Sequence, residues 1–402
     1  MIRISFRSLL FHLILLILCF FINFGWTEFL NITISENENL LLENNFKKVN
    51  CLRYKTNKFI PIKYWNEEQK HNEKIKNQTN INLRYSTNHI SSFTTFYDQL
   101  DSSIEKVIYN GIYSGSSKTI PDFKITVTLI STQDPDIFYD AIDTYNERVF
   151  TTLIYEHPEL WWLGAYSLDI LAYKYGSKYY YETTYNVLPS ISRFQNYSGT
   201  QVSKLSKRIN FIKNDIKQKI STLGLTSDYA ILRYIHDYLI AKITYYLDEN
   251  KKHIRNVYGA LVENKCVCEG YSESLQLIAK DYGIDVIIAR SKEHEWNFAK
   301  IKNKWYVIDV TWDDPTIKGK DPPSGSYSNL YTSFFLIGTS NPNYTENESI
   351  VEHALIYSAY SVTNKLIKYP IIQSNDYSPT IQEKFEVNSI KFNTSYISSE
   401  LG

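Results

Sequence analysis

The chain has 402 residues, 43% of them hydrophobic and 15% aromatic, and its 43 basic and 43 acidic residues give a formal net charge of zero. This composition excludes a chain that is disordered throughout, since such chains have few apolar residues and a large net charge. The charge balance also argues against a nucleic-acid-binding protein, which normally carries an excess of basic residues. The length predicts two or three domains.

The first 27 residues have the layout of a secretory signal peptide. Arg3 and Arg7 precede an apolar run over residues 9–22, broken only by His12. This run is shorter than the ~20 residues that span a bilayer and matches the apolar region of a signal. We therefore predict a secreted protein with a signal peptide at 1–27 and no stable membrane insertion; an uncleaved membrane anchor is the alternative. Six Asn-x-Ser/Thr sites agree with secretion and glycosylation.

Residues 28–91 are polar and show no sustained apolar period, which predicts a low-complexity linker. A small α+β domain is expected over residues 92–198. Apolar residues recur at helical spacing from residue 96 to 108, a strand is predicted over 123–130 and a helix over 136–155. Aromatic runs on both sides of residues 175–177 predict a hairpin.

A second domain is predicted over residues 199–370, followed by a C-terminal tail at 371–402. It begins with two predicted helices, at 199–223 and 227–246, and Ser227 is the expected N-cap of the second. His236 lies beside the apolar stripe of that helix. The sequence predicts a half-buried packing role for His236 and no chemistry.

Cys268 lies where a helix is expected to begin. Apolar residues recur every three or four positions from Tyr271 to Tyr282, and Gly283 supplies the stop. The unpaired N–H groups at a helix N-terminus lower the pKa of a thiol, and the thiolate is the better nucleophile. The position therefore predicts an activated cysteine, with its own N–H directed at an oxygen that becomes negative during attack.

A hairpin is predicted to follow, with strands at 296–301 and 305–310 and a two-residue turn at Lys302-Asn303. In that register His294 and Asp309 lie on the same face, because side chains alternate with a period of two. A loop with an odd number of residues would put them on opposite faces. The even register lets a carboxylate hold an imidazole whose other nitrogen faces Cys268, which is a thiol–imidazole–carboxylate triad.

The segment from residue 256 to 315 resembles the transglutaminase-like superfamily, in its microbial extracellular branch. The motifs that carry the resemblance are Tyr258-Gly259-Ala260-Leu261, Cys268-Glu269-Gly270-Tyr271, His294-Glu295-Trp296-Asn297 and the run from Trp305 to Pro315. The similarity extends upstream to residues 235–239 and downstream through 334–337 to His353. It implies an α+β, papain-like core in which a nucleophile helix packs on an antiparallel sheet, with Cys268 as nucleophile, His294 as base and Asp309 as the group that orients the base.

The resemblance leaves the reaction open between acyl transfer from protein glutamine and hydrolysis of amide or peptide bonds. The expected partner is a protein or peptide substrate, in a pocket lined by Tyr258, Trp296 and Trp312. A non-catalytic extracellular or wall-associated binding module on the same fold is the alternative, since fold alone does not establish activity. No cofactor and no metal site are predicted, because no cluster of oxygen ligands has the spacing of a calcium loop.

The cysteine count suggests one disulfide. Without Cys19, which would leave with the signal, Cys51, Cys266 and Cys268 remain. In a secreted protein a bond between Cys51 and Cys266 would leave Cys268 as the free thiol.

Overall fold

The computed structural model describes residues 52–56, 59–62, 89–90, 92–117, 123–189, 197–248, 250–314, 331–345, 353–359 and 364–390. All of these belong to one compact unit, Asn50–Gly402. The predicted signal peptide, most of the predicted linker and Cys51 lie outside the described residues. Within the described part of the chain, no helix has the length and apolar character needed to cross a membrane.

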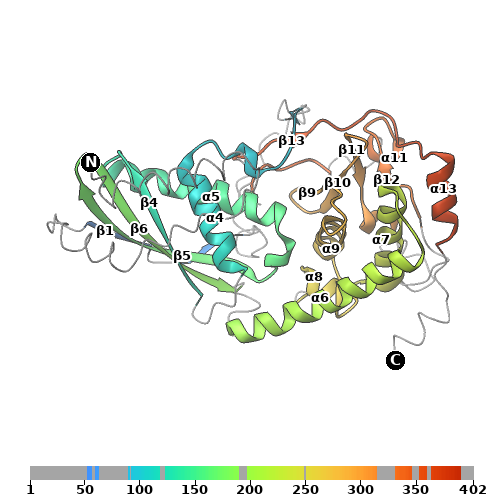
Figure 1. The fold of residues 1–402 in the computed structure, drawn as a ribbon, viewed down its shortest axis with the longest axis horizontal. Coiled ribbons are helices and arrows are strands. Elements are labelled where there is room, and N and C mark those ends of the chain that lie inside the picture. Colours follow the sequence, from blue (N-terminus) through green and yellow to red (C-terminus); the bar gives the residue numbers. More distant parts are fainter. Residues whose placement is uncertain are drawn as a thin grey trace, which may run out of the picture. The chain divides into compact units, whose positions relative to one another are not determined.

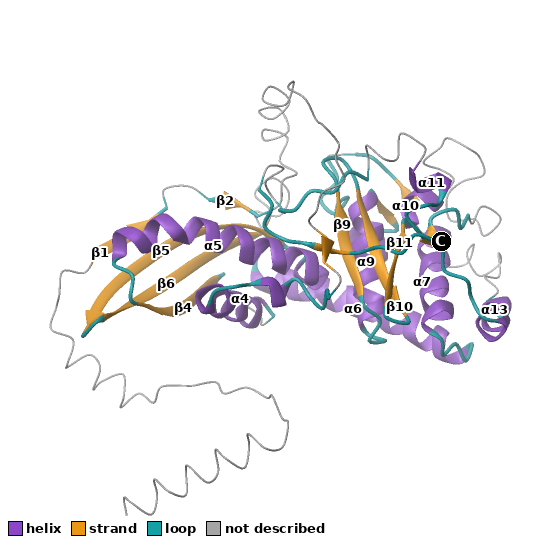
Figure 2. Cartoon of the chain, turned by 90° about the horizontal axis from the view of Figure 1, so that it is seen from above, coloured by secondary structure: helices purple, strands orange, loops and turns teal. Residues whose placement is uncertain are grey.

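The first part of the unit is an antiparallel sheet with helices on one face (Figures 1 and 2). The strand order is β1-β5-β6-β4, and β2 pairs with β5. Every second side chain of β4 is buried, so only one face of this strand packs against the protein. The elements are β1 (Leu52–Lys55), β2 (Ile60–Pro61), η1 (Tyr97–Gln99), α4 (Ser103–Ser116), β4 (Lys124–Ser131), α5 (Pro135–Glu156), η2 (Pro158–Leu160), β5 (Leu163–Tyr175) and β6 (Lys178–Pro189).

The strand, the helix and the hairpin predicted for this part are confirmed as β4, α5 and β5–β6. The turn of the hairpin contains Gly176 at φ +60°, a conformation that glycine adopts without strain. The predicted linker differs, because β1 and β2 fall inside residues 28–91 and pair with β5. Arg53 on β1 forms two hydrogen bonds, of 2.8 and 2.5 Å, with the carboxylate of Asp169 on β5.

The second part is a four-stranded antiparallel sheet of order β12-β11-β10-β9. Helix α9 packs on β9 and β10 and also contacts α7 and α8 (Figure 1). The elements are α6 (Gly199–Thr222), α7 (Asp228–Lys242), α8 (Val257–Leu261), α9 (Cys268–Lys280), β9 (Val286–Arg290), β10 (Glu295–Ile301), β11 (Lys304–Ile308), α10 (Val310–Asp313), β12 (Phe335–Ile337), α11 (Pro342–Thr345) and α13 (Ile381–Asn388). The fold is thus α+β, a mixture of helices and antiparallel sheets.

The described residues also form two short parallel pairs: β7 (Thr244–Tyr245) with β8 (Lys265–Cys266), and β3 (His89–Ile90) with β13 (Tyr369–Pro370). Ser227 caps α7 as predicted, since its hydroxyl accepts from the N–H of Ala230 at 3.3 Å.

The segment expected as a tail packs on the core as far as residue 390. The N–H of Gln373 donates to the carbonyl of Trp305 at 3.0 Å. Helix α13 contacts α7, and its Glu386 accepts from the backbone N–H groups of Thr226 and Ser227, each at 3.0 Å. These partners lie far earlier in the sequence, and local pattern does not reveal contacts at such separations.

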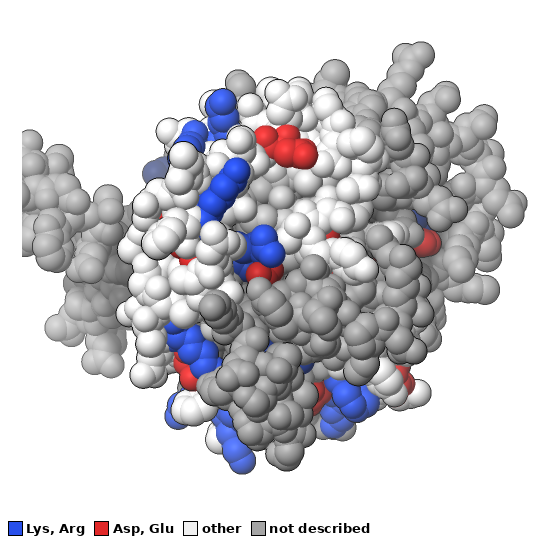
Figure 3. Space-filling model, turned by 90° about the vertical axis from the view of Figure 1, so that its right-hand side faces the viewer, with Lys and Arg blue, Asp and Glu red and all other residues white. Residues whose placement is uncertain are grey.

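The charged side chains on one face of the molecule are mixed in sign. In Figure 3 the described Lys and Arg side chains lie among Asp, Glu and many uncharged residues, without forming one continuous patch on that face. This distribution follows the balanced composition of the chain.

Candidate active site

Cys268 is the first residue of α9, and Val267 is its N-cap, so the predicted helix start is confirmed. The helix ends at Lys280, two residues before the expected end. Gly270 is required for the tight entry into α9. A Cβ at this position would lie 2.5 Å from the side chain of Cys266, closer than van der Waals contact allows. The small residue thus lets β8 turn directly into the helix that carries Cys268.

The hairpin that carries His294 and Asp309 has the predicted register. Ile301 pairs with Lys304, and the turn residues Lys302 and Asn303 have φ of +50° and +62°, as in the two-residue turns that match strand twist. His294 directly precedes β10 and Asp309 directly follows β11. Their side chains meet, with His294 Nε2 at 2.6 Å from Asp309 Oδ2. The even-register prediction is confirmed for this pair.

Asp309 is completely buried and holds a second imidazole. His353 Nε2 lies 2.9 Å from Asp309 Oδ2, the oxygen that also contacts His294. The other oxygen, Oδ1, caps α10 by accepting from the N–H of Trp312 at 3.0 Å. Burial alone would raise the pKa of Asp309, but the charge and hydrogen bond of His294, with those of His353, hold it well below its usual value. The carboxylate is therefore ionised. The family resemblance extends to His353 without assigning it a role, and no local pattern marks it as a partner of Asp309.

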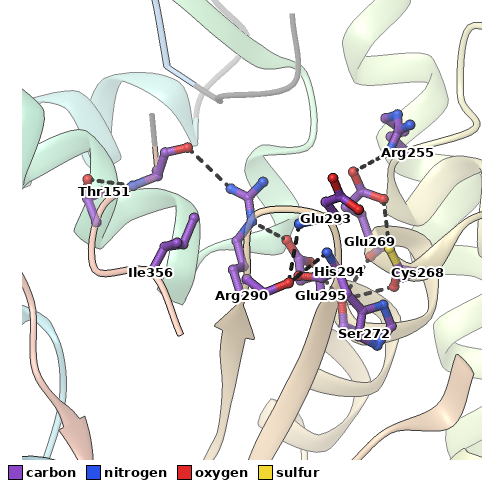
Figure 4. A network of polar contacts seen from close by, with 12 residues as sticks. Thr151, Arg255, Cys268, Glu269, Ser272, Arg290, Glu293, His294, Glu295 and Ile356 are labelled. Atoms are coloured by element: carbon purple, nitrogen blue, oxygen red, sulfur yellow. Dashed lines mark hydrogen bonds and ion pairs between the residues drawn. The ribbon is translucent and has the colours of Figure 1, made fainter. Parts of the chain in front are cut away.

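Glu295 links the start of β10 to the start of α9 (Figure 4). Its backbone N–H donates to the Cys268 sulfur, and its carboxylate accepts from Ser272 Oγ at 2.6 Å and lies 3.1 Å from Arg290 Nε. Ser272 is one turn along α9 and also donates to the carbonyl of Cys268 at 3.1 Å. These contacts bring the sulfur beside the residue that follows His294. The expected sulfur-to-nitrogen distance of about 3–4 Å stays a prediction.

The pKa of Cys268 is opposite to the expectation from its helix position. The side chain is buried, and its thiol donates to Glu269 Oε2 at 3.3 Å, while Arg255 Nη1 lies 2.8 Å from Glu269 Oε1. Burial, followed by the charges of Glu269 and Glu295, raises the pKa of Cys268 well above its usual value. The predicted lowering is wrong, because a helix terminus contributes only ~0.3–1 kcal/mol at typical sites and two nearby carboxylates oppose it.

Replacing Glu269 with glutamine is expected to lower the pKa of the Cys268 thiol, because the change removes a negative charge one residue away. The measurement is the rate of Cys268 alkylation by iodoacetamide against pH, followed by mass spectrometry. Wild-type labelling should rise only at alkaline pH, and the rise in Glu269→Gln should begin lower. Exposed Glu293 provides the control, since Glu293→Gln should leave the profile unchanged. Fast wild-type labelling at mildly acidic pH would contradict the raised pKa.

The three aromatic residues expected around a substrate have different positions. Trp296 is buried, with its ring parallel to that of His294 at 5.7 Å and at right angles to that of His353 at 4.6 Å. Trp312 is half-buried, and its ring is perpendicular to that of His294 at 6.3 Å. Tyr258 instead lines a cavity whose lining includes neither of these tryptophans. Trp296 thus packs against both imidazoles inside the protein. Trp312 is the more exposed of the two tryptophans, so it is the one that a substrate could touch.

His236 is completely buried, and the expectation of half-burial is wrong. Its Nδ1 lies 2.9 Å from Asp237 Oδ1, and its Nε2 lies 3.1 Å from Asp313 Oδ2. Asp313 also accepts from the N–H of Phe334. Burial alone would lower the pKa of His236, but the two carboxylates raise it. Through these two contacts the ring ties α7 to α10, the helix that Asp309 caps.

His294, Asp309 and His353 are the described residues that could together hold a cation, since one ligand atom from each lies within 4.8 Å of the others. Two ligands of a tetrahedral zinc, each ~2.0 Å from the metal, are more than 3 Å apart, whereas the imidazole–carboxylate distances are 2.6 and 2.9 Å. The distances match hydrogen bonds better than shared coordination. The prediction of no metal therefore stands as a prediction.

Cys266 is a buried free thiol in this structure. The expected bond to Cys51 stays a prediction, because Cys51 lies outside the described residues. The side chain of Cys266 packs against Gly270 and Ala260, on the side of α9 next to α8. Burial raises the pKa of the Cys266 thiol, so it is a packing residue.

No family model and no curated protein matches the chain. Similar solved structures include a TGase (14% identity, TM-score 0.23, covering 37% of this chain and 44% of that one). They also include menin, in a structure that reveals the binding site for the Mixed Lineage Leukemia (MLL) protein (18% identity, TM-score 0.25, covering 34% of this chain and 30% of that one). A third is a candidate protease from Parabacteroides distasonis (8% identity, TM-score 0.21, covering 36% of this chain and 39% of that one). The chain spans less than half of each, and at these TM-scores the likeness carries no functional argument.

Proposed function

We propose that this protein is a transglutaminase-like thiol enzyme that acts on amide bonds, with Cys268 as nucleophile, His294 as base and Asp309 as the orienting carboxylate. The observation that carries the proposal is the buried pair of His294 and Asp309, 2.6 Å apart, on a hairpin whose next backbone N–H donates to the Cys268 sulfur. Support also comes from the four sequence motifs that resemble the superfamily.

The mechanism follows from the contacts of His294. Its Nε2 is engaged by Asp309, which leaves Nδ1 to accept the proton of the Cys268 thiol. Because the pKa of that thiol is raised, His294 removes the proton as the sulfur attacks the amide carbonyl, in general-base fashion. The C–N bond then breaks, and the imidazolium protonates the leaving ammonia or amine. An amine or water cleaves the thioester and regenerates the thiol, which gives acyl transfer or hydrolysis respectively.

The non-catalytic binding module is the second candidate, because one observation favours it. Cys268 is only 4% exposed, and a substrate carbonyl must reach its sulfur. A binding module needs no such access. The buried imidazole–carboxylate pair favours the enzyme, since a pure binding module gains nothing from an oriented base.

The test is a pair of assays run on the secreted form of the full chain. One assay measures incorporation of a fluorescent primary amine into a glutamine-containing protein, and the other measures peptide cleavage and ammonia release. Activity in either assay that depends on Cys268 supports the enzyme, and their ratio distinguishes transfer from hydrolysis. The absence of both activities over a broad set of protein substrates would favour the binding module.

A further inference from the structure

A cavity of about 440 Å³ lies between α6, α8 and β8. Its size falls within the range of pockets that hold small ligands, roughly 300–1,000 Å³. The lining combines three lysines and a histidine with aromatic and aliphatic side chains and a single acid: Tyr197, Leu205, Lys251, Lys252, His253, Tyr258, Glu263 and Lys265. A cavity with this charge balance attracts anions, although the chain as a whole is neutral.

The lysines are held at the cavity by aromatic rings. Lys251 and Lys265 both place their ammonium groups over Tyr246, each at 5.6 Å from the ring centroid. Lys252 lies over the ring of Tyr197 at 5.3 Å. Within the described part of the chain, neither Lys252 nor Lys265 forms an ion pair with a carboxylate. Both lysines are exposed, so a ligand can reach them.

The floor of the cavity is neutral and aromatic. The His253 ring lies against the Tyr258 ring at 4.3 Å and near Trp161 at 5.6 Å. Burial lowers the pKa of His253 to about 4, so the ring is uncharged at neutral pH. The Tyr258 hydroxyl accepts from Arg208 Nη1 at 2.7 Å, which adds another cation beside the wall. A ligand with apolar groups as well as negative charge fits such a surface better than a bare ion does.

Lys265 connects this cavity to the candidate active site. It lies on β8, three residues before Cys268, and three residues of extended chain span at most ~11 Å. A substrate in extended conformation covers the same distance with about three residues. The cavity lining at Lys265 thus lies within about the length of three extended residues of Cys268 along the chain.

We infer that this cavity binds acidic side chains of a peptide substrate, so that the protein prefers amides with Asp or Glu about three to four residues away. The inference rests on the proposed function only for the position of the amide. Binding of the acidic segment itself requires the lysines and the aromatic floor, and it is measurable without catalysis.

The experiment uses the full chain with Cys268→Ala, so that no turnover occurs, and measures fluorescence anisotropy of a labelled peptide. The peptide carries one glutamine with two glutamates three and four positions away, and a matched peptide has glutamines in place of the glutamates. We expect the acidic peptide to bind at least tenfold more tightly. The double change Lys252→Glu and Lys265→Glu should remove this preference. Lys384 on α13 is exposed and lies outside the cavity, so the control variant Lys384→Glu should keep the preference for the acidic peptide.

Competition with inorganic phosphate tests whether the cavity recognises negative charge. Displacement of the acidic peptide by phosphate, without displacement of the matched amide peptide, would support a site that selects negative charge. Equal binding of the two peptides would overturn the inference. So would an equal loss of the preference for the acidic peptide in Lys384→Glu, or binding of phosphate without binding of either peptide. Because binding is measured in the Cys268→Ala chain, an inactive wild type would refute the proposed function and leave this result unaffected.

Discussion

Replacing Cys268 with alanine is expected to abolish amide chemistry and to leave the fold intact. Activity should fall by at least about a thousandfold, the order of loss when a covalent nucleophile is removed. The side chain is small, and it forms a hydrogen bond with Glu269. Its loss should therefore change the free energy of unfolding by about 1 kcal/mol. The measurements are amine incorporation, peptide cleavage and urea unfolding of the two purified chains.

Cys266 supplies the matched control for this experiment. It is a buried free thiol two residues from Cys268, but it lies on the other side of the helix start, against Gly270 and Ala260. Cys266→Ala should retain most of the activity. If instead Cys268→Ala keeps wild-type activity, the nucleophile is not Cys268 and the proposed mechanism fails.

The site could be predicted from sequence as far as it depends on local pattern. The start of α9 at Cys268 follows from apolar spacing, and the meeting of His294 with Asp309 follows from the parity of a two-residue turn. Both are properties of adjacent elements, in which geometry is set by the period of the helix or strand. The pairing of β5 with β6 was predictable for the same reason.

The electrostatics of the site could not be predicted in this way. The pKa of Cys268 depends on how deeply it is buried and on Glu295, which reaches it across the fold. His353 meets Asp309 from 44 residues away, and the contacts of residues 371–390 with α7 and β11 cross larger separations. Tertiary contacts decide such properties, and no spacing in the sequence encodes them.

Replacing Asp309 with alanine should reduce both activity and stability. Its carboxylate holds His294 and His353 through one oxygen and caps α10 through the other. Activity should fall by about a thousandfold or more, because the base loses its orientation. Removing one member of a buried ionic group costs about 3–5 kcal/mol. Asp285, which pairs with Lys300 near the surface, is the control, and Asp285→Ala should cost less than about 1 kcal/mol.

The pH dependence of unfolding separates this role of Asp309 from simple packing. The pKa of Asp309 is lower in the folded protein than in the unfolded chain, where Asp titrates near ~3.9. Its stabilisation is therefore complete above that value and is lost as pH falls toward the folded pKa. The difference in unfolding free energy between wild type and Asp309→Ala should shrink below about pH 4. A difference that stays constant into acid would show that Asp309 acts through volume and not through its charge on the two imidazoles.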